Sequence, residues 1–333
     1  MKCSRTLAFS HSARTNQRGL SLVELMVAMV IGLFLTAGVF TMFSMSSSNV
    51  TTTSQFNQLQ ENGRIALTIL ERDITQLAFM GDITGTEFIV GTNTTVDVAG
   101  IDDCIGGGVN NATLPNNLAA HFRRLWAYEY PVASGKSTLS CLTNVKNDTD
   151  VLQLKRLIGP DITSREPSKI YVTASSSEAV FVSGTTTPSK IIDNSRTWEY
   201  QHHVYFIADD TAGIPILRRK TLTNSGMNND EQLVEGIESI HYLFGFDNDG
   251  DSTPDSYVPA NSIDDLMWDN QGFQRLVAIK IFLLVRSTNE DSSYTNETTY
   301  SLGEKTIEPL NDHYRRKVLS TTVVLENPIL IRS

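Results

Sequence analysis

An acidic segment late in the chain offers the side chains best suited to hold a metal ion. Asp247, Asp249 and Asp251 occupy alternate positions, and Asp255 follows four residues after the third of them. Calcium in proteins takes about six to eight oxygen ligands, which carboxylates and backbone carbonyls supply when a tight turn brings them together. The spacing therefore predicts either a calcium site formed by these four aspartates or an acidic turn that is only solvated.

The same segment departs from the EF-hand, the best-known calcium loop. Ser252 stands where that loop has a glycine, and Val258 stands where it has a bidentate glutamate. Asp264 or Asp265 is an alternative source of a further carboxylate. Calcium is the only cofactor that the sequence suggests.

No other constellation in the sequence predicts catalysis. The triplet Gly135–Ser137 resembles the end of a phosphate-binding loop, but Tyr130 occupies the position of the required first glycine. No G-x-S-x-G pattern is present. The histidines beyond the first 19 residues lack the spacing of metal ligands; they are His121, His202, His203, His241 and His313. We therefore expect that the chain is not an enzyme.

The charge of the chain is unevenly distributed. Its first 19 residues carry four basic side chains and no acidic one, so the formal charge of the remainder falls from −10 to −14. An acidic chain offers no basic face for phosphates, which argues against a non-specific nucleic-acid binder. A basic leader ahead of an apolar run and an acidic body is typical of an exported protein.

The apolar run itself occupies residues 20–43 and contains a single charge, Glu24. As a helix it is about 36 Å long, which is enough to span a bilayer. A carboxylate in such a helix costs roughly 2.5–3.5 kcal/mol at the membrane centre and less near the interface. If the chain is cut after Gly19, the new amine of Leu20 lies four residues away and is a natural partner. The alternative is a glutamate that reaches out to the membrane edge.

The octapeptide from Arg18 to Leu25 resembles the type III signal of type IV prepilins and type II secretion pseudopilins. The resemblance implies that a membrane peptidase cuts between Gly19 and Leu20 and methylates the new N-terminus at Leu20. It also implies that Glu24 guides the docking of subunits in a filament. The family more often has Phe after the glycine, so Leu20 departs from its pattern. The implied partners are the prepilin peptidase, other minor and major pilins, the inner-membrane assembly platform and inner-membrane lipids.

Export would also bear on the cysteines. Cys3 lies in the leader, which leaves Cys104 and Cys141 as a candidate pair. An oxidising compartment favours a disulfide between them, and the alternative is two unrelated buried thiols.

Beyond the apolar run, the pattern predicts an α+β fold of the pilin kind. A long N-terminal helix, transmembrane in its first half, packs on an antiparallel sheet with strand-rich insertions. The expected parts are a leader (1–19), a transmembrane or filament-core helix (20–43), its amphipathic second half (44–82) and a β-rich head (83–333). The apolar stripe of the second half comprises Phe56, Leu59, Ala66, Ile69, Leu70, Ile74 and Leu77.

The head is expected to begin with a long, loop-dominated connection over residues 84–150, in which the pair Asp102–Asp103 is solvated. Strands are expected beyond it. Their ranges are 151–157, 170–173, 179–182, 203–208, 216–222, 237–246, 276–285 and 318–325.

Short segments in the head are similar, in their order, to those of PilW-type minor pilins. They are Glu71–Ile74, Asp150–Leu152, Leu233–Glu238, the turn that starts at Asp247, Leu284–Ser287, Tyr314–Val318 and Thr321–Val323. The resemblance implies a minor pilin that takes part in the assembly or initiation of a type IV pilus, with roles in twitching, adhesion or DNA uptake. It places the chain in the inner membrane as a single-pass protein with a periplasmic head, and then in the pilus at the cell surface.

Two other functions remain open at this level. The first is a pseudopilin of a type II secretion system, and the second is a calcium-dependent adhesin at the pilus tip. The basic triplet Arg315–Lys317 could contact DNA or an anionic membrane, or form a solvated strand edge or a subunit contact. No specific nucleic-acid partner is predicted.

Overall fold

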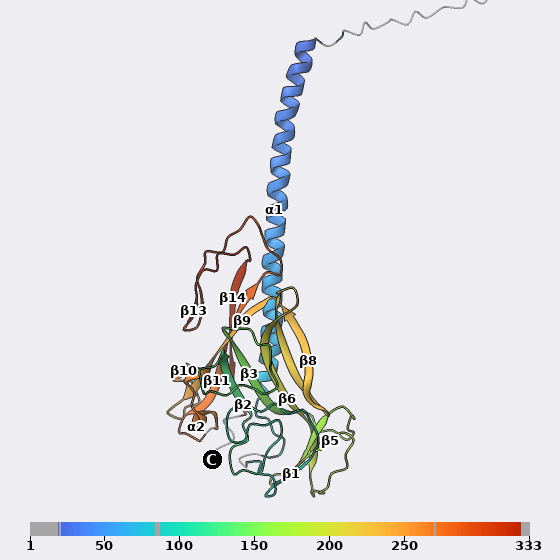
Figure 1. The fold of residues 1–333 in the computed structure, drawn as a ribbon, viewed down its shortest axis with the longest axis vertical. Helices are drawn as coiled ribbons and strands as arrows, with labels where there is room; N and C mark the ends of the chain where they lie inside the picture. The colour runs from blue at the N-terminus through green and yellow to red at the C-terminus, as the bar shows by residue number, and fades with distance from the viewer. Residues whose placement is uncertain (1–18, 20, 84–86, 270, 328–333) are drawn as a thin grey trace, which may run out of the picture. The chain divides into compact units, whose positions relative to one another are not determined.

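A computed structural model describes residues 19, 21–83, 87–269 and 271–327 of the chain (Figure 1). The chain divides into two compact units, residues 1–54 and residues 55–333. Helix α1 (Leu22–Ile74) contributes to both of them. We refer to the second unit, residues 55–333, as the head.

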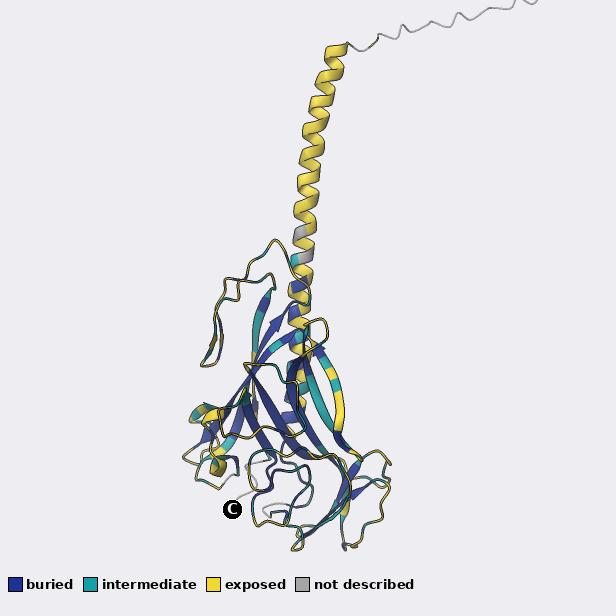
Figure 2. Cartoon of the chain, in the orientation of Figure 1, coloured by how far each residue is buried: buried dark blue, intermediate teal, exposed yellow. Residues whose placement is uncertain are grey.

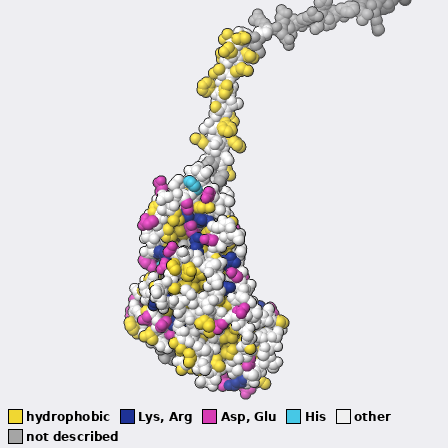
Figure 3. Space-filling model, in the orientation of Figure 1, with side chains coloured by type: hydrophobic (Ala, Val, Ile, Leu, Met, Phe, Trp, Pro, Cys, Tyr) yellow, Lys and Arg dark blue, Asp and Glu magenta, His cyan; other side chains and the backbone are white. Residues whose placement is uncertain are grey.

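In the first unit, α1 exposes apolar side chains along its length, as the visible face shows (Figure 3). An 18-residue stretch has a mean hydropathy of 2.3, and none of it is buried, so the helix is long and apolar enough to cross a membrane. The hydroxyls of Thr36 and Thr41 donate to the carbonyls of Gly32 and Ala37, one turn earlier, at 2.7 and 2.8 Å. These local bonds satisfy polar groups that have no other partner in an apolar medium.

In the head, α1 is amphipathic as predicted, but it ends at Ile74 and does not continue to residue 82. Leu59, Ala66, Leu70 and Ile74 are buried, at helical spacing, whereas Phe56 remains 38% exposed.

Two left-handed residues, Ala78 and Gly81, turn the chain after this helix. A side chain at Gly81 would collide with the ring of Trp198, because its Cβ would lie 2.7 Å from that ring. After α1 ends, the chain therefore passes close to the indole ring of Trp198, where only glycine fits.

The larger sheet of the head has eight strands. Six follow the order β1–β5–β4–β6–β3–β2, and the β7–β8 hairpin pairs with β6. Every pairing is antiparallel except that of β1 with β5. The strands are β1 (Thr94–Asp97), β2 (Leu125–Tyr130), β3 (Thr149–Ile158), β4 (Ile170–Ala174), β5 (Ala179–Ser183), β6 (Arg196–Asp209), β7 (Pro215–Thr223) and β8 (Gly226–Glu235).

The second sheet has four strands in the order β10–β9–β11–β14, all antiparallel. A small β12–β13 hairpin packs apolar residues against it. Helix α2 and the short 3₁₀ turn η1 lie between β10 and β11. The elements are β9 (Ile237–Asp247), β10 (Ser256–Pro259), η1 (Ala260–Ser262), α2 (Asp265–Trp268), β11 (Arg275–Arg286), β12 (Tyr300–Leu302), β13 (Lys305–Ile307) and β14 (Arg316–Val324).

Strand β3 is buried on both of its faces (Figure 2). Arg156 lies on the face that meets α1, together with His203 and Tyr205 of the neighbouring β6. Gln153 and Lys155 lie on the opposite face, because successive side chains of a strand alternate. That second face is covered by the segment that follows β1 and precedes β2.

Asp73, near the end of α1, is the carboxylate that joins this helix to the larger sheet. It is buried and accepts hydrogen bonds from Nε of Arg156 at 3.0 Å, from the hydroxyl of Tyr205 at 2.6 Å and from Nδ1 of His203. Burial acts to raise the pKa of Asp73. The effect of burial is outweighed by the hydrogen bond and charge of His203, by the charge of Arg156 and by the hydrogen bond from Tyr205. The pKa of Asp73 therefore lies below its usual value.

We expect Asp73→Asn to lower the free energy of unfolding by about 3–5 kcal/mol, because it leaves the buried Arg156 without its charge partner. Since folding depresses the pKa of Asp73, its contribution is full above the unfolded value near 3.8 and is lost as the pH falls below it. Urea titrations of the detergent-solubilised chain between pH 3 and pH 7 measure both effects. Glu61→Gln is the control, since its pair with Arg64 is exposed.

Gly226, at the turn between β7 and β8, has a φ of +109°, and its Cβ would lie 2.2 Å from the carbonyl oxygen of Asp102. That backbone cannot move away, because the Asp102 carbonyl accepts the amide of Met227 at 2.8 Å. We expect Gly226→Ala to cost about 2–4 kcal/mol of unfolding free energy. Gly213 also has a positive φ but faces open space, so Gly213→Ala should cost only about 1 kcal/mol. Equal losses in urea titration would show that the contact with Asp102 is unimportant.

Candidate functional site

The start of α1 carries the residues predicted for processing and assembly. Gly19 is exposed, and Leu20 lies outside the described residues. The backbone N–H of Ser21 donates to Oε2 of Glu24 at 3.0 Å, and the amide of Val23 donates to the Ser21 hydroxyl at 3.3 Å. Ser21 and Glu24 therefore form a capping box at the N-terminus of the helix.

This capping box is a role of Glu24 that the sequence analysis missed, although the S-x-x-E spacing before an apolar run is its usual signal. The carboxylate also lies in the first turn of α1, where the helix dipole favours a negative charge. Glu24 thus has a local partner while the leader is still attached. Cleavage after Gly19 and docking through Glu24 stay predictions.

The acidic turn follows β9 directly and brings together three of the four predicted ligands. One carboxylate oxygen each of Asp247, Asp249 and Asp255 lie within 4.8 Å of one another. Asp251 is not in this group. Its carboxylate instead accepts the amide of Thr253 at 2.7 Å.

Backbone amides already stabilise the negative charge of this turn. Asp247 accepts those of Asp249, Gly250 and Ser252 at 3.0, 2.6 and 2.9 Å. The hydrogen bond from Gly250 is the main cause that lowers the pKa of Asp247. Backbone amides therefore favour the ionised form of Asp247 next to the two other clustered carboxylates, and a calcium ion would use the remaining lone pairs of the three.

The two further acids considered as ligands are engaged elsewhere. Asp264 caps helix α2 by accepting the amide of Met267 at 2.8 Å. Asp265 accepts Nη2 of the fully buried Arg123 at 3.0 Å. Neither carboxylate belongs to the group of three that could hold a metal among the described residues.

If the turn binds calcium, we expect about 10 mM calcium to raise the unfolding free energy by about 1.4 kcal/mol, given a Kd of about 1 mM, as in extracellular modules. Asp255→Asn should abolish this gain, because Asp255 is one of the three clustered carboxylates. Asp251→Asn is the matched control and should retain it. Thermal unfolding with and without calcium provides the measurement, and the absence of a gain in the unmodified chain would leave a solvated acidic turn.

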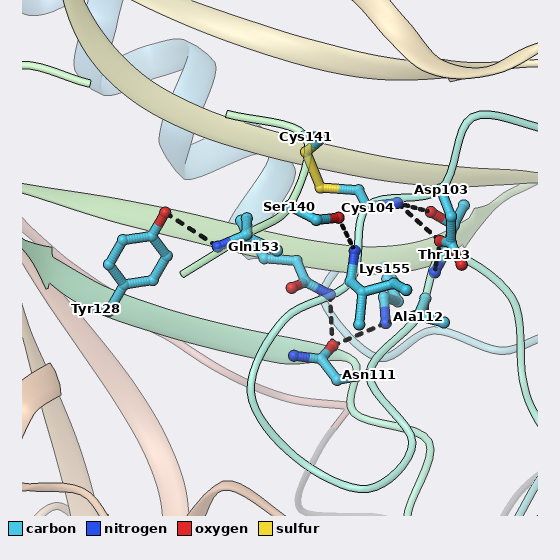
Figure 4. The surroundings of a disulfide bond; sticks show 12 residues. Asp103, Cys104, Asn111, Ala112, Thr113, Tyr128, Ser140, Cys141, Gln153 and Lys155 are labelled. Carbon is cyan, nitrogen blue, oxygen red and sulfur yellow. Dashed lines mark hydrogen bonds between the residues drawn. A yellow bond between two sulfur atoms is a disulfide. The ribbon is translucent and has the colours of Figure 1, made fainter. Parts of the chain in front are cut away.

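Cys104 and Cys141 are joined by a disulfide, as the sequence predicts (Figure 4). Around it, the backbone N–H and C=O of Ile105 bond to the Ser140 hydroxyl and amide at 2.8 and 2.9 Å. Asp103 is not merely solvated, because its Oδ1 accepts the amides of Cys104 and Thr113 at 2.7 and 2.8 Å. The expected loop-dominated segment is thus an ordered layer that also contains β1 and β2.

Beside this layer lies a cavity of about 590 Å³ between β2, the loop after it, and the η1–α2 region. Among the residues that line it are Trp126, Tyr128, Glu129, Lys136 and Trp268. Burial raises the pKa of Tyr128 to about 12, so its phenol stays neutral. The Glu129 carboxylate is paired with Lys305. The cavity therefore offers indole and phenol rings beside a lysine, and it was not predicted from the sequence.

The basic triplet at the start of β14 does not form a free cationic patch. Arg315 pairs with Asp291 at 2.7 Å. Arg316 is buried between Glu238 and Asp312. Two of the three charges are therefore neutralised within the head, which removes the basis for a contact with DNA or with an anionic membrane.

Comparison with known proteins gives two matches, both to family models. The model described as Type IV Pilus-assembly protein W matches residues 204–327, which run from β6 past β14. The prokaryotic N-terminal methylation motif matches residues 14–40, which include Gly19 and Glu24. Neither the curated proteins nor the solved structures include a significant match. With a prepilin motif at the start of its apolar helix and a region similar to PilW in its β-rich head, the chain resembles prepilin-like proteins, and the two matches support a type IV pilus-related minor pilin.

Proposed function

We propose that the chain is a minor pilin that is incorporated into a type IV pilus and takes part in its assembly or initiation. A prepilin peptidase removes its leader between Gly19 and Leu20, and α1 then holds it in the inner membrane with its head in the periplasm. The observation that carries the proposal is the exposed apolar helix with Glu24 in its first turn, on a chain whose head matches the PilW model.

This role requires that the apolar surface of α1 be shielded from water. In the first unit, apolar side chains from Leu22 to Met45 are exposed on every side of α1. Lipid covers such a helix before assembly, and the helices of other pilins cover it within a filament. Glu24 then exchanges its capping bond for the amine of a neighbouring subunit, which is the kind of partner that a carboxylate in apolar surroundings requires.

The role is structural and not catalytic. Three buried charged groups of the head, Asp73, Arg156 and Arg316, are engaged in ion pairs that join its elements. None of the three lines the cavity beside β2. We propose that the head acts by contacting other pilins and the assembly platform.

The test is complementation of a deletion strain of the source bacterium. We expect the deletion to abolish surface pili in electron micrographs, and the unmodified chain to restore them. Glu24→Val should not restore them, although mass spectrometry should show its leader removed and the protein in the inner membrane. Glu61→Gln, an exposed change on the same helix, is the control and should restore pili.

The phenotype of the deletion strain also distinguishes a pilus-assembly role from a role in type II secretion or in adhesion. Intact pili together with lost export of secreted enzymes would show a pseudopilin of a type II secretion system. Normal pili together with lost attachment would show a tip adhesin. Restoration of pili by Glu24→Val would contradict the assembly role assigned to Glu24.

A further inference from the structure

Lys155 of β3 is an ionisable residue that is buried in the head without an ion-pair partner in the described part of the chain. Its side chain is fully buried on the sheet face opposite α1, where Nζ lies 4.4 Å from the ring centroid of Phe122. Nζ donates to Oδ1 of Asn111 at 3.0 Å and to the carbonyl of Ala112 at 2.6 Å. No carboxylate of the described residues forms an ion pair with it within 4.0 Å. Burial without an ion-pair partner disfavours the charged form of this lysine.

The surroundings reinforce that state. Burial lowers the pKa of Lys155 well below its usual value, although the charge of Asp103 acts in the opposite direction. A desolvated lysine amine retains a free lone pair and is a nucleophile. Lys155 is therefore a reactive amine held against a carboxamide.

That carboxamide belongs to Asn111, and it is polarised by its neighbours (Figure 4). Nε2 of Gln153 donates to the same oxygen of Asn111 at 2.7 Å. Gln153 and Lys155 point the same way because they are two residues apart on β3. Nδ2 of Asn111 donates to the carbonyl of Gly107 at 2.9 Å, which fixes the plane of the amide. When the Lys155 amine adds to the carbon, Nε2 of Gln153 remains as the donor that stabilises the negative charge developing on this oxygen.

His202 is the third residue of this cluster and carries a group that can take up a proton. It pairs with Lys155 across β3 and β6, so the two Cβ atoms are cross-strand neighbours, about 5 Å apart. Its imidazole is fully buried, and neither ring nitrogen has a hydrogen-bond partner among the residues that the structure describes. Burial is the main cause that lowers the pKa of His202, so its ring is neutral. An unsatisfied buried imidazole is costly, and a role beside the amine accounts for it.

We propose that Lys155 and Asn111 become joined by an intramolecular amide bond between Nζ and Cγ. The amine lone pair attacks Cγ, and His202 takes the proton that Nζ releases. The proton passes to Nδ2, the Cγ–Nδ2 bond breaks, and ammonia leaves as the carbonyl re-forms. One amine and one carboxamide thus give one secondary amide and ammonia, with no oxidant or reductant. This modification goes beyond the proposed function and does not depend on it.

Peptide mapping of the full chain tests the bond directly. The protein is extracted from membranes with detergent, reduced, alkylated and digested with trypsin, so that the disulfide contributes nothing. We expect a branched product in which residues 73–123 are joined to residues 147–156, uncut after Lys155. Its mass should be about 17 Da below the sum of the two peptides, which is the mass of ammonia. Separate peptides 73–123 and 147–155 at unmodified mass would overturn the proposal.

Variants assign the roles. Lys155→Met should give only the unlinked peptide 73–123. His202→Asn should lower the fraction of linked chains, measured at a fixed time after synthesis, by roughly 10-fold or more if the imidazole transfers the proton. His313→Asn, at an exposed histidine, is the control and should link fully. Full linkage in His202→Asn would overturn the part given to His202, and linkage in Lys155→Met would show that another amine reacts.

Discussion

The arrangement of the central strands in the head depends on the burial of the Asp73 carboxylate. A buried charge is tolerated only when donors surround it, and here these donors come from β3 and β6. They reach Asp73 only when Leu154 of β3 pairs with His203 of β6. Since a shift of one residue would turn every side chain to the other face, the helix fixes the register of the central strands.

That register also determines what lies on the far side of the sheet. When His203 and Arg156 face α1, their neighbours His202 and Lys155 must face the disulfide-closed layer. The central strands therefore carry polar groups on both faces, which is uncommon in a core and requires satisfied partners on each side. The helix and the layer after β1 are thus coupled through two strands, although they do not share a face of the sheet.

The sequence predicted what depends on local pattern and missed what depends on distant partners. The apolar stripe of α1 and most strands follow from periodicity, and the prepilin motif follows from a short, contiguous segment. Strand β8 was missed because its residues 228–232 are all polar and form a strand only by pairing with β7. The roles of Asp73 and Asn111 involve residues far along the chain, so no local pattern could reveal them. The close approach of Gly81 to Trp198 likewise involves residues far apart in the sequence.

The disulfide has a consequence for how far the head can be extended by force. Cys104 and Cys141 are 37 positions apart in the sequence, whereas their Cα atoms are 4.8 Å apart. A chain of that length, fully stretched, would add about 120 Å to an unravelling subunit. The disulfide carries tension directly from one cysteine to the other. The residues between them therefore do not extend when the subunit is pulled. A subunit pulled by its neighbours would yield in shorter steps, and the layer over the central strands would be among the last parts to lose its shape.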